Sequence, residues 1–322
     1  RVTVDIENRM VHVAAWQFRV RGESGGEVSV YLLDTDLPEN QPWDRPLTDL
    51  LYGGDEYYRL CQEVVLGFGG HRLLQALGYN HIRRFHMNEG HAALLVLALL
   101  EEKLASRVQE ASIPADLIDA VREQCVFTTH TPVPAGHDQF PPDLAHRALG
   151  DRRCAWLRAC GHDRSLNMTE LALHGSRFVN GVAMKHGEVS NNLFPGYPIH
   201  SITNGVHAVT WAAPSFQALY DRYLPDWRRD QLSLRYAISV PGEEIWKAHQ
   251  EAKRLLVEHV NHETNAGFDR DVLTLGFARR AAAYKRGTLI FHDIERLAAI
   301  AQQVGPLQIV FGGKAHPRDQ DG

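Results

Sequence analysis

The sequence has few cysteines, no long hydrophobic run and no large excess of either charge. Its four cysteines show no C-x-x-C spacing, which argues against a structural zinc site and favours free thiols in a reducing compartment. The longest apolar run, AALLVLALL at residues 92–100, is less than half of the roughly 20 residues that cross a bilayer. A formal net charge of −5 gives no global positive field for nucleic acid or anionic lipid. These absences argue against membrane and nucleic-acid partners and predict a cytoplasmic protein.

Histidine is plentiful, but its spacing does not indicate a metal site. His81, His86 and His91 recur every five residues, which does not match H-E-x-x-H and would place them on different faces of a helix. We therefore predict no metal.

A chain of 322 residues is longer than most single cores grow, so two domains are predicted. Hydrophobic residues make up 44% of it, enough for a sizeable core. The chain begins with Arg1 rather than Met, and a strand-like pattern starts at once. We expect an internal piece of a longer protein.

The hydrophobic pattern changes along the chain. Up to residue 36 it has period two and predicts a β-rich ribbon. Beyond that, predicted strands alternate with predicted helices, which is typical of an α/β domain with a mainly parallel sheet. Gly67, Gly69 and Gly70 are expected to end a helical segment. The strands are predicted near residues 82–86, 126–130, 177–182 and 200–203, and the helices near 57–77, 92–104, 168–173, 184–193 and 214–223.

A second unit follows a long helix predicted for residues 243–259. Residues 272–277 and 308–311 are predicted strands around a helix at 287–304, which is the first half of a nucleotide-fold domain. We place the boundary so that residues 1–265 form one α/β domain, incomplete at its start, and residues 266–322 form the truncated beginning of another.

Polar loops follow the predicted strands, where ligands bind in α/β proteins. Three loops carry Asn, Glu and His side chains, which suit a hydroxyl-rich ligand, although His130 alone fits a core hydrogen bond equally well. A fourth carries Arg280 and Lys285, which can converge on a phosphate, although a solvated basic helix start gives the same pattern. After the next strand, glycines let the backbone approach an anion. The residues concerned are Asn88, Glu89, His91, His130, Asn204, Arg280, Lys285, Gly312, Gly313 and Lys314.

Taken together, these loops resemble the glycogen/α-glucan phosphorylase family of glycosyltransferases, in its short bacterial and archaeal form. The resemblance implies a GT-B fold with doubly wound, Rossmann-like domains, of which the second is truncated here, and a pyridoxal 5′-phosphate cofactor. The matching blocks are FHMNEGHAALL (85–95), FTTHTPVPAGHDQF (127–140), RFVNGVAMKHGEVS (177–190), HSITNGVHAVTW (200–211), ARRAAAYKR (278–286) and FGGKAHPRDQDG (311–322).

The resemblance also implies residue roles in the phosphorolysis of terminal α-1,4-glucosyl units, with retained configuration. His130 would sit at the scissile glucosyl unit, in a pocket lined by Asn88, Glu89, His91 and Asn204. The catalytic cations Arg280 and Lys285 would bind the attacking phosphate. Arg279, Gly312, Gly313 and Lys314 would bind the cofactor, whose Schiff-base lysine would lie outside this chain.

Two other functions remain open at this stage. A nucleotide-sugar glycosyltransferase of the glycogen or starch synthase type shares the architecture and a basic pair after the first strand of its second domain. A truncated, non-catalytic carbohydrate-binding scaffold is the other alternative. We expect the chain alone to be inactive, and the family implies a homodimer at full length, acting on an α-1,4-glucan and inorganic phosphate.

Overall fold

The fold is described from a computed structural model, in residues 1–51, 53–105, 114–133, 136–159, 161, 164–282 and 285–315. The chain divides into two compact units, Arg1–Gly205 and Val206–Gly322, and each is described by itself. The domain boundary predicted after residue 265 lies inside the second unit and stays a prediction.

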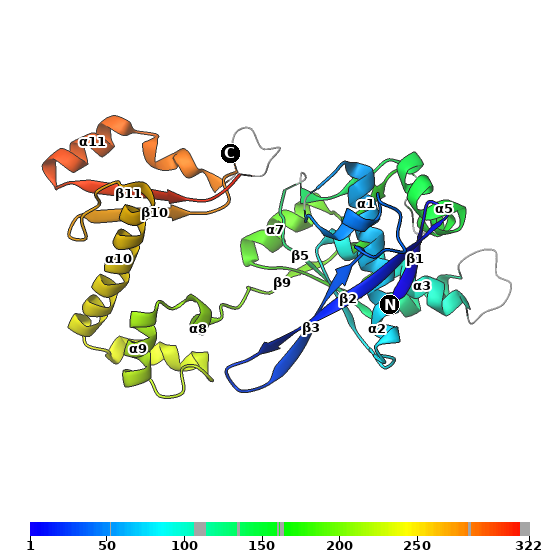
Figure 1. The fold of residues 1–322 in the computed structure, drawn as a ribbon, viewed down its shortest axis with the longest axis horizontal. Coiled ribbons are helices and arrows are strands. Elements are labelled where there is room, and N and C mark those ends of the chain that lie inside the picture. Colours follow the sequence, from blue (N-terminus) through cyan, green and yellow to red (C-terminus); the bar gives the residue numbers. More distant parts are fainter. Residues whose placement is uncertain are drawn as a thin grey trace. The chain divides into compact units, whose positions relative to one another are not determined.

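The first unit opens with an antiparallel sheet in the order β1-β2-β3. Its strands are β1 (Val2–Ile6), β2 (Arg9–Arg21) and β3 (Glu27–Asp34), as the period-two pattern predicts. Glu7 and Asn8 join β1 to β2 with positive φ at both positions, which is the geometry of a tight hairpin turn. Figure 1 shows β2 and β3 as a long hairpin. Its base packs into the core through side chains that include Val11 and Val13.

A four-stranded parallel sheet in the order β4-β5-β8-β9 forms the centre of this unit. Its strands are β4 (Phe85–Asn88), β5 (Cys125–Thr129), β8 (Phe178–Gly181) and β9 (Ile199–Ser201). The helices between them are α3 (Leu95–Ala105), α4 (Ala115–Arg122), α5 (Pro142–Ala159), α6 (Met168–His174) and α7 (Met184–Leu193), with short pieces η3 (Gly90–Ala92), β6 (Gln139–Phe140) and β7 (Leu166–Asn167). The predicted mixed α/β fold with a parallel sheet is therefore confirmed for this unit.

The core of the first unit lies between the sheet and its helices. Phe68, Met87, Leu97 and Phe127 are almost completely buried. The apolar run at residues 92–100 supplies α3, which is buried inside the protein. None of the helices in the described ranges is long and apolar enough to span a membrane.

A glycine-rich segment continues a helix instead of ending it. A short turn, η1 (Arg45–Thr48), precedes helix α1 (Glu56–Val64). Helix α1 continues through a π-helical turn, η2 (Val65–Gly69), into α2 (Gly70–Ala76). A Cβ atom at Gly67 would lie 2.7 Å from the Cβ of Leu94, so glycine allows close packing here. The expectation that these glycines end a helical segment was wrong, because the chain continues through them from η2 into α2.

The second unit has a helical part and a two-stranded parallel sheet. Trp227 is 1% exposed and anchors the helical part. Its elements are α8 (Ala208–Trp211), α9 (Pro214–Tyr223), η5 (Gln231–Ser239), α10 (Gly242–Thr264), β10 (Leu273–Ala278), η7 (Gly287–Phe291), α11 (Ile294–Gln303) and β11 (Leu307–Gly312). Strands β10 and β11 pair in parallel, as the strand-helix-strand prediction requires.

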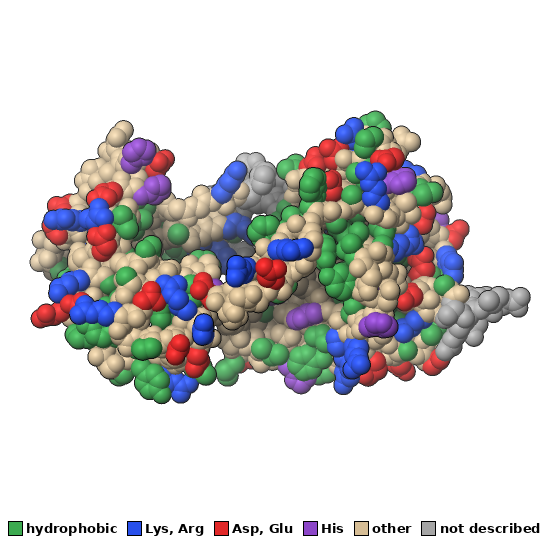
Figure 2. All heavy atoms as spheres, turned by 60° about the horizontal axis from the view of Figure 1, so that its bottom comes forward, with side chains coloured by type: hydrophobic (Ala, Val, Ile, Leu, Met, Phe, Trp, Pro, Cys, Tyr) green, Lys and Arg blue, Asp and Glu red, His purple; other side chains and the backbone are tan. Residues whose placement is uncertain are grey.

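Large hydrophobic side chains remain exposed on both units, and Figure 2 shows such side chains among charged ones on the face it presents. On the hairpin, Trp16 pairs with Leu32 and Phe18 with Val30 across the strands, and all four are exposed. One face of this ribbon is therefore apolar and open to solvent.

Candidate functional site

The carboxyl edge of the parallel sheet carries the predicted sugar-binding residues. Asn88 is the last residue of β4, Glu89 follows it directly, and His130 follows β5. Asn204 lies beyond β9, where its backbone N–H donates to the carbonyl of Val182 at 3.0 Å. Asn88 and Asn204 are both exposed. The structure therefore brings β4 and β5, and the residues that follow them, side by side at one edge of the sheet.

Glu89 joins two of these loops. Its Oε1 accepts a hydrogen bond from the backbone N–H of His130 at 2.6 Å, and its own N–H donates to the carbonyl of Thr128 at 3.0 Å. Its backbone has φ 64° and ψ 170°, a conformation that costs a non-glycine residue about 1–3 kcal/mol. Its Oε2 is buried and has no hydrogen-bond partner among the described residues. A residue with a strained backbone and a buried carboxylate oxygen that lacks a hydrogen-bond partner is expected at a binding site rather than in an ordinary core.

Neutral histidines surround Glu89. Burial lowers the pKa values of His91, His137 and His186, although the charge of Glu89 acts in the opposite direction on each. A hydrogen bond of 2.8 Å joins His137 Nδ1 to Thr169 Oγ1. The Nε2 atoms of His137 and His186 are buried and make no hydrogen bond within the part of the chain that the structure describes. Neutral imidazoles both donate and accept, which suits a ligand rich in hydroxyl groups.

Sequence reasoning named His91 but missed His137 and His186. Both lie inside the quoted motif blocks, His137 in FTTHTPVPAGHDQF and His186 in RFVNGVAMKHGEVS, so the blocks held the signal. No group of three His, Cys, Asp or Glu side chains that could hold a metal ion occurs in the described ranges.

A chain of hydrogen-bonded polar side chains joins three strands of the sheet. His86 Nε2 and Thr128 Oγ1 lie 2.6 Å apart, and the Thr128 hydroxyl donates to Asn180 Oδ1 at 3.0 Å. These three residues belong to β4, β5 and β8. The chain links the neighbouring strands close to the edge at which Glu89 and His130 lie.

A second buried carboxyl lies beside the site on helix α1. Arg59 and Glu63 are one turn apart, with Arg59 Nε 3.3 Å from Glu63 Oε1. Arg59 also donates from Nε and NH2 to Asp138 Oδ2, at 3.2 and 3.1 Å. Burial, and next a hydrogen bond with Asp138, raises the pKa of Glu63 well above 4.5. One guanidinium thus serves two carboxyl groups, and Glu63 is the one whose pKa burial raises.

The second unit has a basic cavity of about 620 Å³ beyond the ends of β10 and β11. Arg279, Lys285 and Arg286 line it together with Gly312 and Gly313, and no acidic side chain is among its described lining residues. Of the predicted phosphate and cofactor residues, the structure thus gathers four: Arg279, Lys285, Gly312 and Gly313. Such a cavity attracts an anion.

Arg280 and Lys314 are exposed and are not among the described lining residues of this cavity. Beyond β10, Ala281 bridges to Ala315. In this segment Arg279, Ala281 and Ala282 line the cavity, whereas Arg280 does not. The binding role of Arg280 stays a prediction.

The two loops at this cavity touch through their backbones. The N–H of Arg279 donates to the carbonyl of Gly312 at 3.0 Å, and the N–H of Ala281 donates to the carbonyl of Lys314 at 3.3 Å. A Cβ atom at Gly313 would lie 2.0 Å from the carbonyl oxygen of Arg279. Only glycine fits at position 313, so the backbone itself forms part of the cavity wall.

The chain belongs to the carbohydrate phosphorylase family, whose sequence pattern matches residues 137–321. The maltodextrin phosphorylase of Thermococcus litoralis is 37% identical over 100% of this chain and 41% of that protein. The glycogen phosphorylase of Mycobacterium tuberculosis is 36% identical over 98% of this chain and 41% of its own length, and that of Aquifex aeolicus 33% identical over 99% and 50%. The chain spans half or less of the length of these relatives. The family resemblance of the motif blocks is confirmed.

Proposed function

We propose that the chain carries residues of both the glucosyl-binding and the phosphate-binding parts of an α-glucan phosphorylase of GT-B architecture. The reaction would transfer the terminal α-1,4-linked glucosyl unit of a glycogen-like or maltodextrin-like glucan to inorganic phosphate, giving glucose 1-phosphate with retained configuration. The observation that carries this proposal is the cavity of the second unit, where Arg279 and Lys285 meet the Gly312–Gly313 backbone in a member of the phosphorylase family.

The sugar would bind at the carboxyl edge of the parallel sheet. Neutral His91 and exposed Asn88 and Asn204 can donate to and accept from hydroxyl groups. Glu89 would position His130 by binding its backbone N–H. A fixed backbone at His130 lets its carbonyl oxygen face the positive charge that develops on a glucosyl group as the glycosidic bond breaks.

Phosphate groups would bind in the basic cavity. Arg279 offers a planar fork of donors, and Lys285 offers a point charge, and both favour an anion over water. The cavity also fits the phosphate of pyridoxal 5′-phosphate, because its wall includes a backbone position that a Cβ would block. When bound, that cofactor supplies an acidic phosphate near the reacting group. Arg279, Gly312 and Gly313 would be the residues of this chain that hold it.

Phosphate binding is the first test, since it needs only residues that this chain contains. We expect Lys285→Ala to weaken the binding of inorganic phosphate to the 322-residue chain about tenfold, measured by calorimetric titration, for the loss of one charge-assisted hydrogen bond. Lys247→Ala, on the exposed face of α10 in the same unit, is the matched control and should leave the affinity unchanged. Equal effects of the two variants would contradict the assignment of the cavity.

Activity separates the proposal from its rivals. We expect the chain alone to form no glucose 1-phosphate from maltodextrin and phosphate, because the family's cofactor lysine lies outside the motif blocks that it carries. Glucosyl transfer from a nucleotide sugar in the absence of phosphate would favour a glycosyltransferase of the synthase type instead. Glucan binding without any phosphate binding would favour a carbohydrate-binding scaffold.

A further inference from the structure

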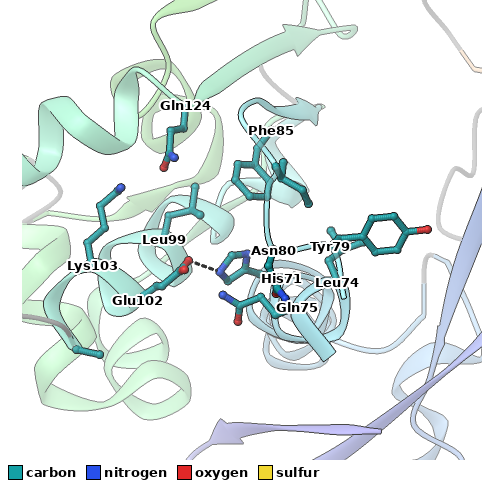
Figure 3. A pocket seen from close by; sticks show the side chains of 12 residues that line it. His71, Leu74, Gln75, Tyr79, Asn80, Phe85, Leu99, Glu102, Lys103 and Gln124 are labelled. Carbon is teal, nitrogen blue, oxygen red and sulfur yellow. Dashed lines mark hydrogen bonds and ion pairs between the residues drawn. The ribbon is translucent and has the colours of Figure 1, made fainter. Parts of the chain in front are cut away.

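A cavity of the first unit lies at the amino edge of the parallel sheet, at the opposite ends of the strands from Glu89 and His130. It measures about 590 Å³, which is within the range of small-molecule sites. Helices α2 and α3 form its sides, and Phe85 at the start of β4 contributes to its wall (Figure 3). Nothing in the proposed phosphorolysis uses this cavity.

A buried histidine with an unused nitrogen lines the cavity. His71 is 7% exposed, and its Nε2 lies 2.8 Å from Glu102 Oε2, a contact that joins α2 to α3. Its Nδ1 is buried and makes no hydrogen bond with any residue that the structure describes. Its ring meets the ring of Phe85 edge to face, with centroids 5.6 Å apart. A buried polar nitrogen without a partner is costly in a core, and a ligand or water that reaches it removes the cost.

Three carboxamides add unused hydrogen-bonding groups to the same wall. Within the described residues, the side chains of Gln75, Asn80 and Gln124 make no hydrogen bond to another residue. In Figure 3, Gln124 lies on the side of Lys103 and Leu99, and Gln75 lies beside His71. A carboxamide both donates and accepts, so its natural complement is a group that also does both, such as a hydroxyl.

The charges of the lining argue for a neutral ligand. Glu102 is paired with His71, and Lys103 is the other charged group of the lining, so no cluster of cations or of anions is present among its described residues. Apolar side chains occupy the rest of the wall and can pack against the C–H face of a ring. These are Leu74, Ile82, Phe85 and Leu99.

We propose that this cavity binds a neutral, polyhydroxylated ring compound of the mono- or disaccharide class. The ring lies against the apolar side chains, and its hydroxyl groups hydrogen-bond the carboxamides of Gln75 and Gln124. One hydroxyl donates to His71 Nδ1, since the pairing of Nε2 with Glu102 places the ring proton on Nε2 and leaves Nδ1 as an acceptor. This site is independent of the proposed function, which uses the opposite edge of the sheet.

The test is a maltose titration of the full 322-residue chain, followed through the side-chain NH2 signals of Gln75 and Gln124 in ¹⁵N NMR spectra. We expect both signals to shift with one dissociation constant. The near-isosteric double variant Gln75→Leu/Gln124→Leu should raise the dissociation constant at this cavity about 30-fold, for the loss of two hydrogen bonds. The signals of Asn80 report the binding in that variant, and unchanged circular dichroism establishes that it folds.

Asn88→Ala separates this site from the proposed substrate site. The signals of Gln75 and Gln124 should respond to maltose equally in this variant, because Asn88 lies at the other edge of the sheet. Maltose shifts that vanish in Asn88→Ala, or that never include Gln75 and Gln124, would overturn the proposal while leaving the proposed function standing. Adenosine, a flat neutral ring compound, is the comparison probe, and tighter binding of adenosine than of maltose would overturn the assignment to sugars.

Discussion

Replacing Glu63 with glutamine tests whether the buried carboxyl beside the candidate sugar site is neutral. Glu63 is 1% exposed, and the Nε and NH2 groups of Arg59 donate to Asp138, while Nε also lies 3.3 Å from Glu63 Oε1. Two ionised carboxylates sharing one guanidinium would leave a net negative charge in a poorly solvated place. A single proton on Glu63 removes that charge and supplies a donor for Asp138. Glutamine has nearly the same shape as the protonated acid and offers the same kind of donor.

The two charge states predict different costs for Glu63→Gln. If Glu63 is neutral, the substitution exchanges one donor for another, and the free energy of unfolding should change by less than about 1 kcal/mol at neutral pH. If Glu63 is ionised and paired with Arg59, removing one partner of a buried ion pair should cost about 3–5 kcal/mol. The gap between these values is larger than the error of a denaturant titration.

The pH dependence of the free energy of unfolding gives a second, independent test of the charge state of Glu63. A carboxyl whose pKa is raised in the folded state contributes stability that is complete below its unfolded value of 4.5 and is lost as pH rises through the folded value. This contribution should be absent in Glu63→Gln, so the stability of the variant should fall less than that of the parent as pH rises above 4.5. Urea unfolding, followed by tryptophan fluorescence at several pH values, measures both effects.

Glu56→Gln is the matched control, because Glu56 lies on the same helix α1 and is exposed. It should change neither the stability at neutral pH by more than about 0.5 kcal/mol nor its slope with pH. A large loss of stability in Glu63→Gln, with an unchanged slope, would refute the argument that Glu63 carries a proton.

Three further predictions concern the two candidate sites. Glu89→Ala leaves the amide of His130 without its acceptor and should lower the free energy of unfolding by about 1–3 kcal/mol in a urea titration, whereas Glu89→Gln keeps an acceptor and should lose less. Gly313→Ala places a methyl group against the carbonyl of Arg279 and should weaken phosphate binding by displacing one loop, as ³¹P NMR titration would measure. Because burial lowers the pKa of His137, its contribution to stability should be lost as pH falls below about 6.5, and His137→Asn should reduce that loss.

Matched controls exist for two of these changes. Gly276→Ala in β10 is the control for Gly313→Ala, since a Cβ there would meet nothing closer than 3.8 Å, and its phosphate affinity should equal that of the parent. His292→Asn, at an exposed position in the second unit, is the control for His137→Asn and should leave the acid slope as it is. If either control behaves like its partner variant, the local explanation fails.

The order of strands and helices could be read from the sequence because each parallel strand alternates with a helix that covers the sheet. The loops after the strands followed directly, so Asn88, Glu89 and His130 were named correctly as residues at strand ends. Helix α5 was missed, because Gly150 interrupts it with a φ of 78° and weakens the helical pattern. Gly67 was misinterpreted, because close packing of a glycine against Leu94 depends on residues far along the chain.

The contacts within the two sites could not be predicted from the sequence. The hydrogen bond from the backbone N–H of His130 to Glu89 could not be predicted from the sequence pattern, because it joins residues 41 positions apart. Arg286, and not Arg280, lines the basic cavity because of the path of the chain between β10 and η7, where Arg286 has a left-handed backbone. The sequence alone does not indicate that path.

The hydrogen bond between Glu89 and the amide of His130 also sets limits on how this part of the protein can diversify. Asn88 and Asn204 are exposed, and their side chains are free to change in a mutant library with little effect on folding. Glu89 combines a strained backbone with a bond to the neighbouring loop, so any replacement there alters both loops at once. A library that aims at a new ligand preference should therefore vary the asparagines and retain Glu89, since variation at that position would be filtered by stability before it could be selected for binding.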